Sequence, residues 1–145
     1  MANVEWLVLA DSAQVVGNKL FLMGGGWDVL TINTGFPAQH RMALAVAFRV
    51  PWNETNQKHN SEIELRTEDG QTLLKIEGQF EVGRPAGIKG GQDQRMQFAA
   101  DLSVPITAPG TYVVAVRLEG QELYKTYFNV IAGPGVALPQ LPPNG

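Results

Sequence analysis

The chain has 145 residues, of which 44% are hydrophobic and 17% charged, with a net charge of −3 and no cysteine. This length suffices for one domain with its own core, and the lack of cysteine excludes disulfides, thiol catalysis and thiolate metal sites. Because the charge is mildly negative and no basic patch stands out, the composition predicts no nucleic-acid partner.

The N-terminal segment carries a short apolar run that includes Glu5 and ends at Asp11. Such a run is too short for a signal peptide or a membrane span, and it lacks the basic residues that precede a signal sequence. We therefore expect a cytoplasmic protein with no membrane partner.

Apolar residues recur with a period of two through most of the chain, which is the period of β-strands. Residues 4–10 are almost continuously apolar, as in a strand that is covered on both faces. Gly17 and Asn18 form a hairpin turn signal before a second short strand, and glycines 24–26 predict a bulge or a break. Trp6 and Trp27 alternate with apolar neighbours and are predicted to pack inside.

The clearest strand spans residues 41–50. Its large side chains alternate with small ones, so one face suits a core and the other is flat and apolar. The small residues of the flat face are Ala43, Ala45 and Ala47. Two interpretations stay open: another segment of the same chain covers this face, or the face is an association surface.

About nine strands follow one another with Gly, Pro and Asn turns between them, and no window of ten residues holds a helical apolar stripe. This pattern predicts an all-β fold without substantial helix, an antiparallel β-sandwich of immunoglobulin-like or jelly-roll type. We expect a single sandwich domain over residues 1–132. Residues 133–145 are rich in proline and glycine and predict an extended tail.

The stretch Asp11–Asp28, DSAQVVGNKLFLMGGGWD, resembles the N-terminal signature of a bacterial domain family of unknown function. In that family a Gly-Lys-Leu hairpin precedes a step of glycine, aromatic residue and aspartate; here Asn18 replaces the usual glycine before Lys19. The resemblance covers roughly residues 3–131. It implies a β-sandwich of immunoglobulin-like or jelly-roll type and brings no catalytic or binding residues with it.

Catalytic chemistry fits the sequence poorly. His40 and His59 are the two histidines, they do not have metal-ligand spacing, and no serine sits in a nucleophile elbow. The glycine clusters lack the helix start or the Lys-Ser/Thr pair that a phosphate loop needs. We expect no enzyme, no metal site and no cofactor.

Two loops, 52–60 and 83–94, form the candidate site for a ligand or partner. If they meet at one end of the sandwich, Trp52 supplies an aromatic platform and Arg84 a fork for carboxylate or phosphate. The alternatives are a salt bridge between Arg84 and Glu54, a calcium site, or side chains that satisfy the loop's own backbone. The candidate residues are Trp52, Asn53, Glu54, Asn56, His59 and Arg84.

The sequence favours a non-catalytic module that associates with itself, as an oligomer or filament subunit, or with another protein. The candidate association surface combines the alanine face with two leucines of the tail, Leu138 and Leu141. The alternative hypothesis is a module that binds a carbohydrate or another small molecule through the loops 52–60 and 83–94.

Overall fold

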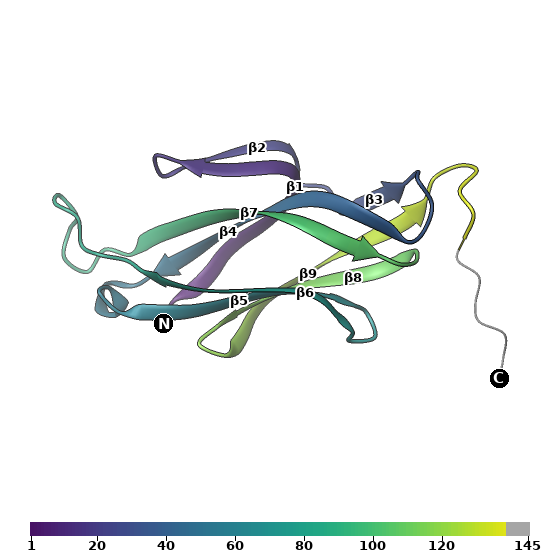
Figure 1. Cartoon of the computed structure of the whole chain (residues 1–145). Coiled ribbons are helices and arrows are strands. Elements are labelled where there is room, and N and C mark those ends of the chain that lie inside the picture. The colour runs from purple at the N-terminus through teal and green to yellow at the C-terminus, as the bar shows by residue number, and fades with distance from the viewer. Residues whose placement is uncertain (139–145) are drawn as a thin grey trace.

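The computed structural model describes residues 1–138, which form two β-sheets packed face to face (Figure 1). The four-stranded sheet has the order β2-β1-β4-β7, and the five-stranded sheet has the order β3-β9-β8-β5-β6. The strands are β1 (Asn3–Val16), β2 (Lys19–Gly25), β3 (Val29–Ile32), β4 (Ala38–Val50), β5 (Lys58–Thr67), β6 (Thr72–Glu81), β7 (Gln94–Ile106), β8 (Gly110–Leu118) and β9 (Gln121–Ala132), with one 3-10 turn, η1 (Trp52–Glu54).

The prediction of an all-β sandwich without substantial helix is confirmed. Neighbouring strands run antiparallel, except that β3 runs parallel to β9. The predicted break at glycines 24–26 is the place where the chain leaves the four-stranded sheet after β2 and joins the five-stranded sheet as β3. Gly24 and Gly26 have φ values of 60° and 86°, a region that side chains with a Cβ seldom adopt.

The core lies between the two sheets and is built from the inward-facing residues of each alternating strand. On β4, Leu44, Val46 and Phe48 have no exposed surface. The ring of Phe48 stacks on Phe80 with centroids 5.0 Å apart, and Phe98 lies 5.8 Å away. These rings join the middle of one sheet to the edge strands β6 and β7.

The outer face of the four-stranded sheet carries the predicted row of alanines. Ala43, Ala45 and Ala47 of β4 lie in register between Ala10, Val8 and Trp6 of β1 and Asp101, Ala99 and Gln97 of β7. All three alanines have no exposed surface, so they do not form an association surface, and this part of the prediction is wrong.

The cover over the alanines comes from the chain itself. β1 pairs with β4 as far as Ala10 and then pairs with β2, and the resulting β1–β2 hairpin folds back over the sheet (Figure 1). At its tip, the carbonyl of Asn18 accepts a 2.9 Å hydrogen bond from the side chain of Gln97 on β7. The alanines are small because a second layer of backbone lies above them.

The two tryptophans near the N-terminus have different environments. Trp27 packs edge-on against Phe128, with centroids 5.7 Å apart, and lies against the core as predicted. Trp6 instead lies on the outer face in register with Ala47, because a bulge between Val4 and Trp6 shifts the register: Val4 packs on the core, and Trp6 lies on the alanine side of β1. Among the described residues no helix is long and apolar enough to span a membrane.

Candidate functional site

The loops 52–60 and 83–94 meet at one end of the sandwich, as the sequence suggests. The guanidinium carbon of Arg84 lies 3.8 Å from the centroid of the Trp52 ring. Its Nε donates to Thr55 Oγ1 at 2.6 Å and its Nη2 donates to the Trp52 carbonyl at 2.9 Å. Arg84 therefore covers one face of the half-buried Trp52, and its guanidinium is already hydrogen-bonded within its own chain. The predicted roles, stacking of a sugar on Trp52 and binding of an anion by Arg84, do not fit this arrangement.

The remaining predicted residues of this end also serve the chain's own structure. Glu54 accepts a hydrogen bond from the backbone amide of Ala2 and lies 3.5 Å from the terminal amine, so its predicted salt bridge with Arg84 is wrong. The buried ring of His59 places Nε2 2.9 Å from the Glu54 carbonyl and Nδ1 3.3 Å from the Glu119 carboxylate.

Two asparagines complete the predicted set. Asn56 has a φ of 59° and donates its backbone amide to the Val82 carbonyl, and the carbonyl of the exposed Asn53 accepts a bond from Gln57. These backbone contacts fix η1 and the end of β6, while the exposed side-chain amides form no hydrogen bond within the described residues, so their part in binding a ligand stays a prediction. Leu138 is 64% exposed, whereas Leu141 lies outside the described residues.

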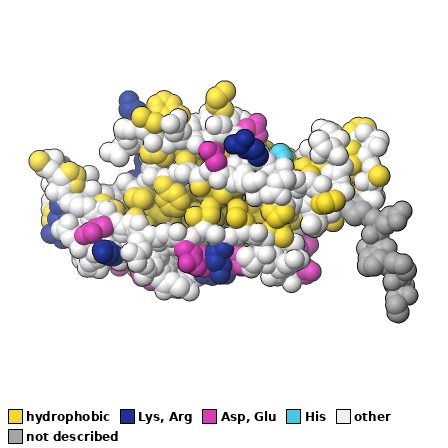
Figure 2. All heavy atoms as spheres, in the orientation of Figure 1, with side chains coloured by type: hydrophobic (Ala, Val, Ile, Leu, Met, Phe, Trp, Pro, Cys, Tyr) yellow, Lys and Arg dark blue, Asp and Glu magenta, His cyan; other side chains and the backbone are white. Residues whose placement is uncertain are grey.

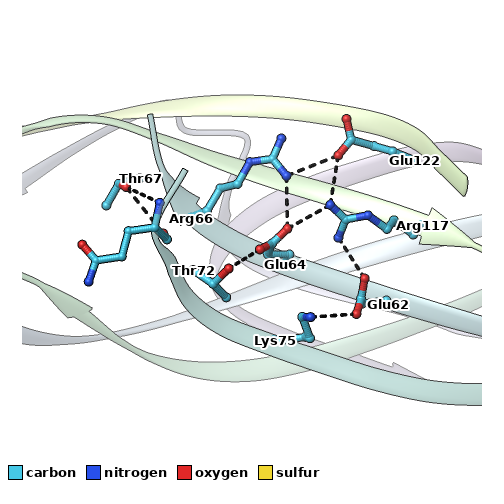
Figure 3. Close-up of polar contacts among 9 residues, drawn as sticks. Glu62, Glu64, Arg66, Thr67, Thr72, Lys75, Arg117 and Glu122 are labelled. Atoms are coloured by element: carbon cyan, nitrogen blue, oxygen red, sulfur yellow. Dashed lines mark hydrogen bonds and ion pairs between the residues drawn. The ribbon is translucent and has the colours of Figure 1, made fainter. Parts of the chain in front are cut away.

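The outer face of the five-stranded sheet holds a network of charges (Figure 3). Arg117 lies 2.8 Å from Glu62 and 3.0 Å from Glu64, and Arg66 lies 3.1 Å from Glu64. A hydrogen bond from the Thr72 hydroxyl, followed by those from Arg117 and Arg66, lowers the pKa of Glu64 from 4.5 to about 2. Since its acids and bases neutralise one another across neighbouring strands, we interpret this network as structural.

The most distinctive surface is the open side of the sandwich, where the edges of the two sheets face each other. β6 ends the five-stranded sheet and β7 ends the four-stranded sheet, so within the described residues neither strand has a neighbour on its outer side. Figure 2 shows hydrophobic side chains in a band between the two sheets on this side. We call this surface the open-side groove; it is lined by Ser61, Ile76, Gly78, Gln79, Phe80, Met96 and Phe98.

The floor of the open-side groove is apolar because β6 and β7 both turn their alternate side chains inward. Ile76, Met96 and Phe98 pack on the core and remain partly exposed, since no strand lies beyond them. The groove contains a hollow of about 180 Å³. Partly exposed aromatic and sulfur-containing side chains of this kind are common where proteins bind other chains.

Gly78 creates the hollow in the groove. It interrupts the inward-facing row of β6, between Ile76 and Phe80, and so leaves the place of one side chain empty. A Cβ added at Gly78 would meet no atom nearer than Ser61 Oγ at 3.8 Å, and its φ lies outside the left-handed region. The glycine is therefore not needed for the backbone or for close packing. Sequence reasoning missed the groove, although a glycine inside an alternating strand is a signal of close approach by another chain.

These features define the molecule, over the residues described, as a two-sheet β-sandwich with an apolar groove between the edge strands β6 and β7. A family model described as "Family of unknown function (DUF6941)" matches residues 5–131, and the chain belongs to this family. The predicted membership in a family of unknown function is thereby confirmed. No curated protein matches the chain.

One similar solved structure is the Pseudomonas fluorescens alkylpurine DNA glycosylase AlkC bound to DNA containing an abasic site analog. The TM-score is 0.47 at 13% sequence identity, and the match covers 89% of this chain and 30% of that chain. The present chain thus spans less than a third of the glycosylase. At this TM-score and identity the likeness carries no argument about what the chain binds.

The sequence predicts self-association and excludes a nucleic-acid partner, and both expectations are corrected. The alanine face that supported self-association is covered by the β1–β2 hairpin. Net charge and composition do not exclude a nucleic-acid partner, and the likeness to a DNA complex is too weak to support one, so the exclusion of nucleic acid is withdrawn as well. Neither expectation enters the proposal below.

Proposed function

We propose that the protein is a non-catalytic module that binds an extended polypeptide segment of a different protein. The segment pairs with the free edge of β6 and lays its apolar side chains into the open-side groove. The observation that carries the proposal is the apolar groove between two edge strands that lack neighbours in the described residues.

The backbone of β6 supports this mode of binding. An edge strand presents a row of unpaired N–H and C=O groups, which is a template for another strand. In strand addition the main-chain hydrogen bonds supply affinity, and pockets for alternate side chains supply specificity. β6 is ten residues long, which is enough to pair with a segment of ordinary strand length.

The size of the hollow favours a side chain over a whole small molecule. Pockets that hold drug-sized ligands measure roughly 300–1,000 Å³, whereas the hollow inside the groove measures about 180 Å³; a second hollow of about 430 Å³ lies along the outward-facing Glu62, Glu77 and Arg117. The lining of the hollow inside the groove by Ile76, Phe80, Met96 and Phe98 suits one large apolar side chain. A bound strand with alternate apolar residues would place one of them there.

A display library of random ten-residue peptides tests the proposal, with Gly78→Val as the decisive variant. Valine has higher strand propensity than glycine, and a Cβ at Gly78 meets no atom nearer than 3.8 Å, so we expect the fold to be kept or stabilised while the hollow is filled. We expect enrichment of peptides with alternating apolar residues, and at least tenfold weaker binding to Gly78→Val by fluorescence anisotropy. Hydrogen exchange should show new protection of the β6 amides on peptide binding.

Gly90→Val is the matched control, because a Cβ at Gly90 meets nothing within 4 Å and its φ is also outside the left-handed region. It lies in the loop between β6 and β7 and should leave binding unchanged. The proposal is overturned if Gly78→Val binds the enriched peptides as well as the parent chain. Protection on another strand, or pairing of two copies through β6 seen by light scattering, would also overturn it.

The proposal retains two expectations from the sequence, namely a bacterial source and a cytoplasmic location. The resemblance of Asp11–Asp28 to a bacterial family supports the first, and the second is carried over from the sequence as a prediction. Cell fractionation with an antibody to the native chain tests the location. Recovery in a membrane or secreted fraction would overturn it.

A further inference from the structure

We infer that the segment bound in the open-side groove is cationic, with lysine or arginine alternating with its apolar residues. This inference rests on the proposed function and names the chemical class of the partner. It follows from the charges that the two edge strands leave uncompensated.

The cations of the two edge strands are already paired. Lys75 Nζ on β6 lies 3.2 Å from Glu62, and Arg95 Nε on β7 lies 2.7 Å from Glu5. Glu62 lies on β5, the neighbour of β6, and Glu5 lies on β1, two strands from β7 in the same sheet, so these positive charges are neutralised at the surface. Neither is available to attract an acidic segment.

The acids of the same strands are in the opposite situation. Glu77 and Glu81 on β6 and Asp101 on β7 are exposed, and none of them forms an ion pair within residues 1–138. The rims of the groove therefore carry carboxylates that form no ion pair in the described chain, although Lys58 of β5 lies in register with Glu81. A positively charged partner complements this charge and is steered toward it.

The alternation of β6 places this charge where a paired strand would meet it. Ile76, Gly78 and Phe80 face the groove, so Glu77 and Glu81 face the other side of the strand. A segment that pairs with β6 in register keeps the same alternation. Its apolar residues then lie over the groove, and the residues between them lie directly beside Glu77 and Glu81, where opposite charges stabilise the pairing and like charges oppose it.

Three synthetic peptides of eight residues test the inference. In each, isoleucine and phenylalanine occupy alternate positions, and the positions between them hold lysine, threonine or glutamate. We expect binding strength in the order lysine, threonine, glutamate by fluorescence anisotropy, and weaker binding of the lysine peptide as salt rises. The double variant Glu77→Lys/Glu81→Lys should weaken the lysine peptide by about tenfold and strengthen the glutamate peptide.

Glu68→Lys is the matched control, since Glu68 is exposed in the turn between β5 and β6, away from the groove lining. It makes half the charge change of the double variant and should alter binding of the lysine peptide less than twofold. A fourth peptide, with lysine and serine alternating, shows whether charge alone causes binding, and it should not respond to Gly78→Val. Thermal unfolding of each variant checks that the fold is kept.

The outcomes separate the inference from the proposed function. If all three apolar peptides bind equally and Gly78→Val weakens each of them, the groove is a polypeptide site but the cationic partner is wrong. If Gly78→Val weakens none of them, the groove itself is not the binding site and both proposals fail. If the lysine–serine peptide binds as tightly as the lysine–apolar peptide, the inference also fails.

Discussion

Glu64 illustrates how single residues stabilise this sandwich. It lies on β5, next to the two neighbouring strands, and its side chain is only 9% exposed although it faces outward. The Thr72 hydroxyl donates to its carboxylate from β6, and Arg117 reaches it from β8. The carboxylate therefore joins three strands of the five-stranded sheet, and these donors hold its pKa at about 2.

The pH dependence of unfolding tests the role of Glu64. Because the folded-state pKa is below the ordinary value of 4.5, the carboxylate contributes stability above about pH 4.5 and loses it as the pH falls toward about 2. Glu64→Gln should lower the unfolding free energy at neutral pH by about 1–3 kcal/mol. The difference in unfolding free energy between parent and variant should narrow as the pH falls through this window, measured by urea unfolding.

Glu68→Gln is the control, because Glu68 is exposed and forms no ion pair in the described chain. It should leave the pH dependence of the unfolding free energy unchanged. A difference between parent and Glu64→Gln that does not depend on pH would contradict the role assigned to Glu64.

Among the elements, the β1–β2 hairpin has the least expected position. The first half of β1 is part of the four-stranded sheet, and the second half belongs to a hairpin that lies over it. A Cβ at Gly25 would lie 3.5 Å from Leu22 and 3.6 Å from Val8, so the hairpin and the sheet are in close contact where β1 bends. Val8 is in register with Ala45, which places this contact above the alanine row.

Ala45→Leu tests the contact between hairpin and sheet. Ala45 has no exposed surface, so three extra carbon atoms must displace the hairpin or strain the sheet, at a cost of roughly 1–3 kcal/mol. Ala99→Leu is the matched control, because Ala99 is in the same row but partly exposed on the edge strand β7, and it should cost less than about 1 kcal/mol. Urea unfolding measures both. If both substitutions lower the unfolding free energy equally little, the hairpin does not pack tightly on the alanine row.

At the scale of the whole molecule, the two sheets share one core, and the open-side groove lies along the margin where β6 and β7 end them. β4 and β8 are central and buried, whereas β6 and β7 end their sheets on the same side. The last strand, β9, ends at Ala132, and the amide of Gly133 donates to the Ile32 carbonyl at 2.8 Å. A folding unit of residues 1–132 stays a prediction from the sequence.

Removal of residues 133–145 tests this boundary. If residues 1–132 are the folding unit, the shortened chain loses the backbone hydrogen bond of Gly133 and about 1 kcal/mol of unfolding free energy. Peptide binding should persist, because the groove is lined by residues 61–98. Urea unfolding and anisotropy measure the two effects. A loss of several kcal/mol would place the boundary beyond residue 132.

Local features of the sequence predicted the strands well. The alternation of β4 identified Leu44, Val46 and Phe48 as core residues, and Gly17 and Asn18 identified the hairpin turn. The glycines after Met23 predicted a break, which the chain uses to change sheets. The site was predicted less well: the two loops meet, but Arg84 stacks on Trp52 and donates hydrogen bonds to its own chain.

The sequence by itself determined the β class, the faces of the strands and their turns, because side-chain period and glycine conformation act over a few residues. Only the tertiary structure decided that a hairpin covers Ala45, and that β6 and β7 become edges on the same side with a hollow at Gly78. A period of two assigns each residue to a face of its strand, but the partner of each strand depends on contacts between distant residues. The open-side groove lies between two strands that lack a neighbour on their outer sides, so Gly78 could mark a site of close approach from the sequence, but the pairing of β6 and β7 as edges could not be read from any local pattern.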